Sequence, residues 1–173
     1  GNVYNIDLDL LIPDKSKSIY NGGITALGVY KDNWVLTPHP KEAADLLGSN
    51  VSHVQNKRLE KAARIGQQYG GVSILKGYRS IITRNSDDIL DKSDKSDKSG
   101  AVICEAGNPG MAVGGMGDVL AGMVAGFIAQ KVPIFYAAVL AVFMHAESAD
   151  KAVDKYGQRG LLPTDLFDYF ADI

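Results

Sequence analysis

A glycine-rich segment in the second half of the chain constrains its fold more than any other feature. Six of the sixteen residues from Gly107 to Gly122 are glycine, and an apolar helical pattern continues from Val119 to Gln130. Glycine reaches positive φ readily and lets a ligand approach main-chain N–H groups without a Cβ in the way. A loop of this kind that opens into a helix directs several N–H donors and the positive end of the helix dipole at one point. The segment therefore predicts an anion site suited to phosphate.

The anion site is expected over Gly114, Gly115, Met116 and Gly117, whose backbone dipoles could stabilise a transferring phosphoryl group without a basic side chain. Asp118 follows directly and has two interpretations. It is either the N-cap of the helix, or a general base that takes a proton from a hydroxyl attacking phosphorus. The glycine spacing matches neither a Walker A loop nor a dinucleotide-binding turn.

Strand-like and helix-like segments alternate along the chain. Strands are predicted over 3–12, 34–36, 72–75, 80–83 and 101–105, and helices over 41–47, 56–69, 119–130, 134–153 and 162–170. This order predicts an α/β fold with a mainly parallel sheet and helices on both faces. At 173 residues the chain is expected to form one domain, 1–173. Three Asp-Lys-Ser repeats inside 87–100 predict a disordered loop there.

Composition excludes several classes of function. The net charge of -2 gives no positive field for nucleic acid. The longest apolar stretch, 134–144, is about half of what a bilayer crossing needs, so no membrane span is expected. A single cysteine, Cys104, and an amino terminus without signal-peptide character favour the cytoplasm.

The segment from Gly107 to Asp118 resembles the Gly-Asn-Pro-Gly-Met-Ala-x-Gly-Gly-x-Gly-Asp signature of the carbohydrate-kinase-like NAD(P)H-hydrate dehydratases. Further motifs of that family appear in the same order: Thr37-Pro38-His39-Pro40, then Leu75-Lys76-Gly77, then Gly160-Leu161-Leu162-Pro163-Thr164-Asp165-Leu166. The resemblance implies a ribokinase-like three-layer α/β/α fold. Because family domains are considerably longer, it also implies the carboxyl-terminal part of such a domain, with the amino-terminal half of the sheet missing.

The resemblance implies roles for particular residues. His39 would contact the hydrated cofactor, and Asp118 would contact the substrate and act as the base. The nucleotide would lie against Lys76, Gly77, Tyr78, Arg79, Ser80 and Gly117. From the residues alone, the favoured interpretation of His39 is a loop histidine fixed between prolines, and that of Lys76 and Arg79 is a solvated hairpin.

The resemblance also implies the reaction, a lyase that dehydrates NADHX or NADPHX at the expense of ADP or ATP. Mg²⁺ is expected to bridge the phosphates, but the metal ligands are unknown, with Asp7, Asp9, Glu105 and Asn108 as candidates only. The resemblance implies a homo-oligomer, and a second chain or a missing segment could complete the sheet.

Two other functions stay open at this point. A ribokinase-superfamily kinase for a small molecule could use the same anion site and aspartate. Alternatively, the chain could be an inactive nucleotide-binding fragment, which would bind nucleotide without turnover.

Overall fold

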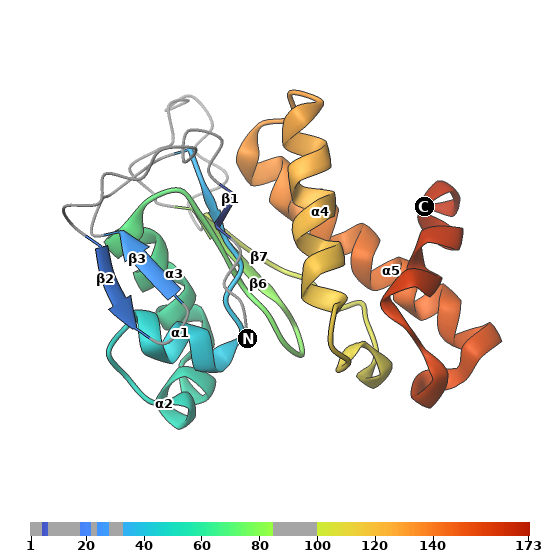
Figure 1. Cartoon of the computed structure of the whole chain (residues 1–173), viewed down its shortest axis with the longest axis horizontal. Helices are drawn as coiled ribbons and strands as arrows, with labels where there is room; N and C mark the ends of the chain where they lie inside the picture. The colour runs from blue at the N-terminus through green and yellow to red at the C-terminus, as the bar shows by residue number, and fades with distance from the viewer. Residues whose placement is uncertain (1–4, 7–17, 22–23, 28–32, 85–99) are drawn as a thin grey trace. The chain divides into compact units, whose positions relative to one another are not determined.

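The computed structural model describes residues 5–6, 18–21, 24–27, 33–84 and 100–173 (Figure 1). These residues fall into two compact units. The amino-terminal unit runs to Gly77 and resumes over Ile81–Val102, and the carboxyl-terminal unit comprises Tyr78–Ser80 and Ile103–Ile173. Most of the strand predicted over 3–12, and the predicted disordered loop except for Gly100, lie outside the described residues.

A five-stranded sheet organises the amino-terminal unit. Its order is β1 (Asn5–Ile6), β4 (Val35–Leu36), β5 (Val72–Leu75), β6 (Ile81–Arg84) and β7 (Ala101–Ile103). A separate antiparallel hairpin joins β2 (Ser18–Asn21) to β3 (Ile24–Leu27).

The predicted α/β fold class is confirmed, and the described strand pairs show that the sheet is mixed. Strand β4 runs parallel to β5, whereas β1 and β6 run antiparallel to their neighbours β4 and β5. The β5–β6 connection, Lys76–Ser80, is much too short for a parallel crossover, which takes a dozen or more residues. An antiparallel return is therefore the only one this loop allows.

Three helices accompany the sheet: α1 (Pro40–Leu46), α2 (Val51–Asn56) and α3 (Arg58–Tyr69), with α3 packed against β5 and β6 (Figure 1). Their apolar faces join the strands in one core, which includes Trp34, Leu36, Ala43, Val54, Ala62, Ile65 and Leu75. Helix α2 was not predicted. Asn50 is its N-cap, since its side-chain oxygen accepts the His53 N–H at 2.8 Å.

The paired glycines after α3 fit closely against Trp34. The indole Nε1 donates to the Gly70 carbonyl at 3.1 Å, and the Val72 N–H donates to the Trp34 carbonyl at 3.0 Å. Gly71 has a φ of +63°, and a Cβ there would lie 2.3 Å from the Trp34 carbonyl oxygen. Only glycine fits this turn, which aligns β5 beside β4.

The carboxyl-terminal unit is helical. It contains the 3₁₀ turn η3 (Pro109–Met111), α4 (Met116–Ala129), α5 (Ile134–Gly160) and the 3₁₀ helix η4 (Pro163–Asp172). Its core is formed by Met116, Ala149, Ala152, Leu161 and Leu166. Helix α5 extends past the predicted end at residue 153 and includes one non-helical residue, Gly157. Among the described residues, no helix combines the length and the apolar character that crossing a bilayer requires.

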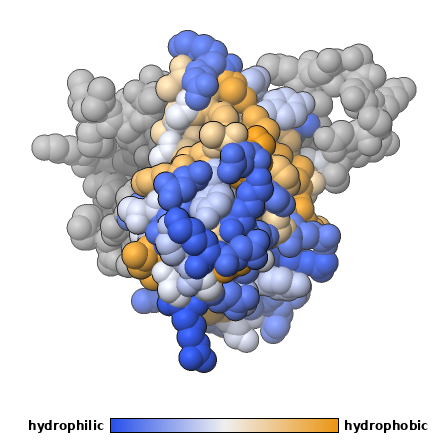
Figure 2. Space-filling view, turned by 90° about the vertical axis from the view of Figure 1, so that its right-hand side faces the viewer, coloured by the Kyte–Doolittle hydropathy of each residue, from blue (hydrophilic) through white to orange (hydrophobic). Residues whose placement is uncertain are grey.

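Figure 2 shows an apolar band bordered by polar side chains on one face of the molecule. The large exposed apolar side chains of the carboxyl-terminal unit include Tyr136, Leu140 and Phe143 on α5, and Leu162 and Phe167 near η4. The three on α5 follow helical spacing, so they form one stripe on that helix.

Candidate functional site

His39 is fixed at the start of α1 by the helix itself. Its Nδ1 accepts the N–H groups of Lys41 and Glu42, each at 3.2 Å, and its own N–H donates to Glu42 Oε2 at 2.7 Å. This is a capping box in which histidine takes the place usually held by serine or threonine. Because Nδ1 is an acceptor, the neutral ring carries its proton on Nε2.

Glu42 connects His39 to Lys76. Its carboxylate is only 3% exposed, with Oε1 3.1 Å from His39 Nε2 and Oε2 3.8 Å from Lys76 Nζ. Despite the short distance to Nε2, no described donor makes a well-directed hydrogen bond to Oε1. The predicted substrate contact and the first predicted nucleotide contact therefore share one buried carboxylate.

Arg58 holds the backbone around Lys76. It donates from Nη2 to the carbonyls of Leu75 at 3.2 Å and Lys76 at 3.4 Å, and burial lowers the pKa of its guanidinium. Gly77 has a φ of +132°, and a Cβ there would lie 3.2 Å from Arg58 Nη1. The strand-end Lys-Gly pair is thus positioned from α3.

Tyr78, Arg79 and Ser80 form a cluster within the carboxyl-terminal unit. The Tyr78 ring is 84% exposed and lies under the Arg79 guanidinium, 5.9 Å from ring centroid to Cζ. Arg79 also forms an ion pair with Glu105, and Ser80 accepts the Cys104 N–H on its carbonyl at 2.9 Å. Arg79 has a φ of +56°, a conformation that costs a non-glycine residue about 1–3 kcal/mol and recurs at binding sites.

The glycine-rich loop presents free backbone donors. Within the described residues, the N–H groups of Gly114, Gly115 and Gly117 meet no acceptor, whereas the Met116 N–H donates to the Val113 carbonyl at 3.4 Å. Helix α4 begins at Met116, so the three groups lie at its positive end. The Met116 side chain is only 4% exposed and anchors the loop in the core.

The N-cap of α4 is Gly115, so the N-cap interpretation of Asp118 is wrong. Gly115 has a φ of +95°, and a Cβ there would lie 3.1 Å from Pro163 Cγ. Asp118 lies three residues later, in the first turn, and its carboxylate is exposed and makes no ion pair or hydrogen bond with any described residue. A carboxylate is thus available beside three free N–H donors.

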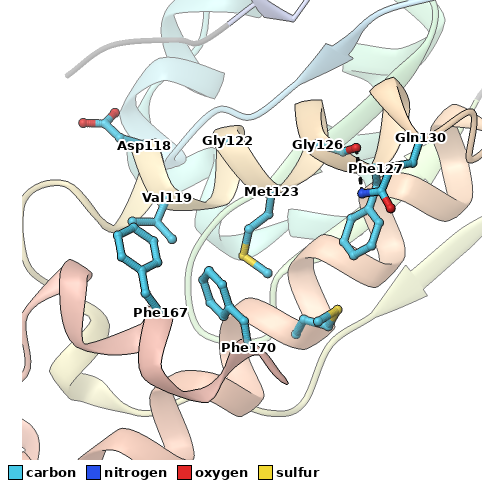
Figure 3. A pocket seen from close by; sticks show the side chains of 10 residues that line it. Asp118, Val119, Gly122, Met123, Gly126, Phe127, Gln130, Phe167 and Phe170 are labelled. Carbon is cyan, nitrogen blue, oxygen red and sulfur yellow. Dashed lines mark hydrogen bonds between the residues drawn. The ribbon is translucent and has the colours of Figure 1, made fainter. Parts of the chain in front are cut away.

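An apolar groove of about 570 Å³ runs along α4 next to Asp118. Its lining is mostly apolar and includes Val119, Met123, Phe127, Met144, Phe167 and Phe170. Figure 3 shows the Asp118 carboxylate directed away from these side chains. Because a nucleotide is strongly charged, we place the candidate site at the glycine-rich loop and not in this groove.

The candidate metal ligands do not form a cluster. Glu105 is paired with Arg79, and both polar atoms of the Asn108 side chain make hydrogen bonds within the protein. Asp7 and Asp9 lie outside the described residues. Across the described part of the chain, no three His, Cys, Asp or Glu side chains come together as they would around a metal ion.

Cys104 is expected to be a slow nucleophile. Burial raises the pKa of its thiol, and the negative charges of Glu147 and Asp150 raise it further. Since the thiolate is the reactive form, alkylation by iodoacetamide at pH 8 should be slower in the folded protein than in the urea-unfolded chain, even after correction for access. The folded-state rate should reach half of its maximum at a higher pH. Equal rates and equal midpoints would contradict this prediction.

Sequence reasoning located the motifs but missed the side chains that hold them. Glu42 contacts the predicted site residues His39 and Lys76, and Arg58 binds the Lys76 carbonyl. Asp150 binds Gly107 and Asn108, just before the predicted anion site. Only Glu42 carried a local signal, because a glutamate three residues after an N-cap completes a capping box.

Comparison with known proteins identifies relatives of this chain. A carbohydrate-kinase family model described as NAD(P)H-hydrate dehydratase matches residues 24–172. The bifunctional NAD(P)H-hydrate repair enzyme Nnr of Coxiella burnetii is 41% identical over 139 residues, which cover 80% of this chain and 26% of that protein. The ADP-dependent (S)-NAD(P)H-hydrate dehydratase of Neisseria meningitidis is 36% identical over 135 residues, or 78% of this chain and 42% of that protein.

Solved structures give the same picture of the fold. The ADP/ATP-dependent NAD(P)H-hydrate dehydratase of Bacillus subtilis, co-crystallised with ATP and Mg²⁺, superposes with a TM-score of 0.69 at 30% identity. The match covers 80% of this chain and 46% of that one. A ribokinase-like protein of Enterococcus faecalis matches with a TM-score of 0.63 at 28% identity, over 80% of this chain and 42% of that one. The predicted ribokinase-like fold is confirmed, and the chain spans about a quarter of the length of its bifunctional relatives.

Proposed function

The chain belongs to the NAD(P)H-hydrate dehydratase family, and on that premise we propose that it dehydrates NADHX or NADPHX to NADH or NADPH while consuming ADP or ATP. One observation carries the proposal: the N–H groups of Gly114, Gly115 and Gly117 have no acceptor, and the exposed Asp118 carboxylate lies in the adjoining helical turn. Free donors at a helix start bind phosphate, and an adjacent carboxylate can accept a proton.

In this proposal Asp118 removes the proton from the hydroxyl group on the hydrated nicotinamide ring. The hydroxyl oxygen bonds to the terminal phosphorus of the nucleotide as the bond from phosphorus to the leaving oxygen breaks. The three glycine N–H groups stabilise the charge on the transferring phosphoryl group. Phosphate then leaves the ring carbon, and the ring loses a proton to restore the dihydropyridine.

The remaining predicted contacts are divided between substrate and nucleotide. We assign His39, whose side chain is 36% exposed, to the hydrated cofactor. We assign Lys76, Gly77, Tyr78, Arg79 and Ser80 to the nucleotide. The exposed Tyr78 ring and the Arg79 guanidinium above it offer stacking surface and positive charge, which suit a base and its phosphates.

Mg²⁺, when bound, would neutralise phosphate charge. The ion needs only one or two carboxylates besides water and phosphate oxygens, so the absence of a three-residue cluster in the described chain does not conflict with it. No described carboxylate is assigned to the ion, since the buried Glu42 Oε1 already lies 3.1 Å from His39 Nε2.

The proposal also covers the oligomeric state and the cellular compartment. On the basis of the family resemblance, we propose that the protein forms a homo-oligomer, acts in the cytoplasm and binds small molecules.

The test of this function is the recovery of NADH absorbance from NADHX by the full chain, with Mg²⁺ and either ADP or ATP. Recovery that requires the nucleotide is the expected result. Nucleotide binding without recovery would contradict the enzymatic function and favour a non-catalytic nucleotide-binding module. Phosphorylation of an unrelated alcohol in place of NADHX would favour a kinase.

A further inference from the structure

Asp150 on α5 holds the segment that leads into the glycine-rich loop. Its Oδ2 accepts the Gly107 N–H at 2.7 Å, and its Oδ1 accepts from Asn108 Nδ2 at 2.8 Å. Both carboxylate oxygens are therefore occupied by donors more than forty positions earlier in the chain. Hydrogen bonds to a charged acceptor are about twice as strong as neutral ones, so this is a firm attachment.

Asn108 connects Asp150 to the turn η3, which precedes the glycine-rich loop. Its Oδ1 accepts the Gly110 N–H at 2.9 Å and so caps η3. Gly110 also lies tightly against α5, since a Cβ there would be 2.6 Å from the Gln158 carbonyl oxygen. The lead-in is thus fixed to α5 at two places about two helical turns apart.

The free donors follow this anchored segment closely. Gly114 is separated from η3 by only Ala112 and Val113, and Gly115 is the N-cap of α4. With so short a connection, a shift of η3 on α5 changes where the Gly114 and Gly115 N–H groups point. A misplacement of about 1 Å at a reacting site can lower a rate by about 10²-fold.

We propose that Asp150 is a positioning residue, which sets the glycine-rich loop for the terminal phosphate of the nucleotide by binding Gly107 and Asn108. The proposal rests on the proposed function, since it assigns the loop to a phosphate. Asp150 itself touches neither substrate nor nucleotide in this account. Its contribution acts through η3.

The test exchanges the two side chains that face each other. Asp150→Asn leaves one donor opposite another donor, and Asn108→Asp places two carboxylates together. Each single variant is expected to weaken ATP and ADP binding by about tenfold, because the displaced loop loses the equivalent of one hydrogen bond to the phosphate. In the double variant, the amide of residue 150 donates to the carboxylate of residue 108, and its carbonyl oxygen accepts the Gly107 N–H. Binding should return to within about threefold of wild type.

The matched control is Asp154→Asn, one turn further along α5 on an exposed side chain, which should bind nucleotide as the wild type does. The dissociation constants of ATP and ADP, the melting temperature, and kcat and KM for NADHX are measured for all five proteins. A purely structural role would lower the melting temperature of the single variants and leave nucleotide affinity unchanged, and that result would overturn the proposal. Failure of the double variant to recover affinity would do the same.

The outcome also separates this proposal from the proposed function. A wild-type chain that binds nucleotide but does not dehydrate NADHX contradicts only the function, and the affinities still report on Asp150. A wild-type chain that binds neither ATP nor ADP overturns both.

Discussion

Asp118→Asn is expected to lower kcat for NADHX dehydration by about 10²–10⁴-fold, the range that loss of a general base produces. The substitution keeps the shape of the side chain but removes its ability to accept the hydroxyl proton. Nucleotide affinity should stay the same or rise, because a negative charge next to the phosphate site is removed. The measurements are the turnover number and the dissociation constants of ADP and ATP.

The position of Asp118 in the first turn of α4 also suits a purely structural role, which the same variant tests. An acid in the first turn of α4 stabilises the helix by about 0.3–1 kcal/mol through the dipole. If that were its entire role, the variant would melt slightly earlier and turn over at nearly the wild-type rate. Asp168→Asn, an exposed aspartate on η4, is the control for loss of one negative charge.

Local sequence patterns predicted most of the elements correctly. The apolar spacing of α3 and α4 and the strand β5 bounded by glycines are signals that depend on neighbours in the chain. The predicted helix boundaries were less accurate. Helix α4 begins at Met116, earlier than predicted, because its N-cap is Gly115 and not Asp118. Helix α2 is six residues long, too short for an apolar periodicity to distinguish it from a loop.

The candidate site was likewise only partly predictable from local sequence patterns. Glycine density and the family motif identified the loop, but which N–H groups are free depends on the path of the backbone around Val113 and Met116. The attachment by Asp150 involves a sequence separation of 43 residues, and no local pattern specifies such a contact. The mixed sheet follows from loop length, which could have been read from the sequence, because Lys76–Ser80 cannot carry a parallel crossover.

Glu42→Ala is expected to lower kcat/KM by about 10²-fold and to destabilise the fold by about 1–2 kcal/mol. The stability loss comes from the capping box, in which Glu42 Oε2 accepts the His39 N–H at 2.7 Å. The loss of activity has a separate cause. Without the carboxylate, the His39 ring and the Lys76 ammonium have no shared partner to hold them, and misplaced binding groups reduce rates steeply. Thermal melts and NADHX kinetics measure the two effects.

Glu42→Gln separates these two contributions. The glutamine carbonyl oxygen can still accept the His39 N–H, so α1 should keep its cap and the melting temperature should fall by no more than a few degrees. The carboxylate charge shared by His39 and Lys76 is lost, so kcat/KM for NADHX should still fall although the cap is kept. Asp45→Asn removes an exposed carboxylate from the same helix, α1, and it should change neither quantity. A wild-type kcat/KM in Glu42→Gln would contradict a role for Glu42 beyond the helix cap.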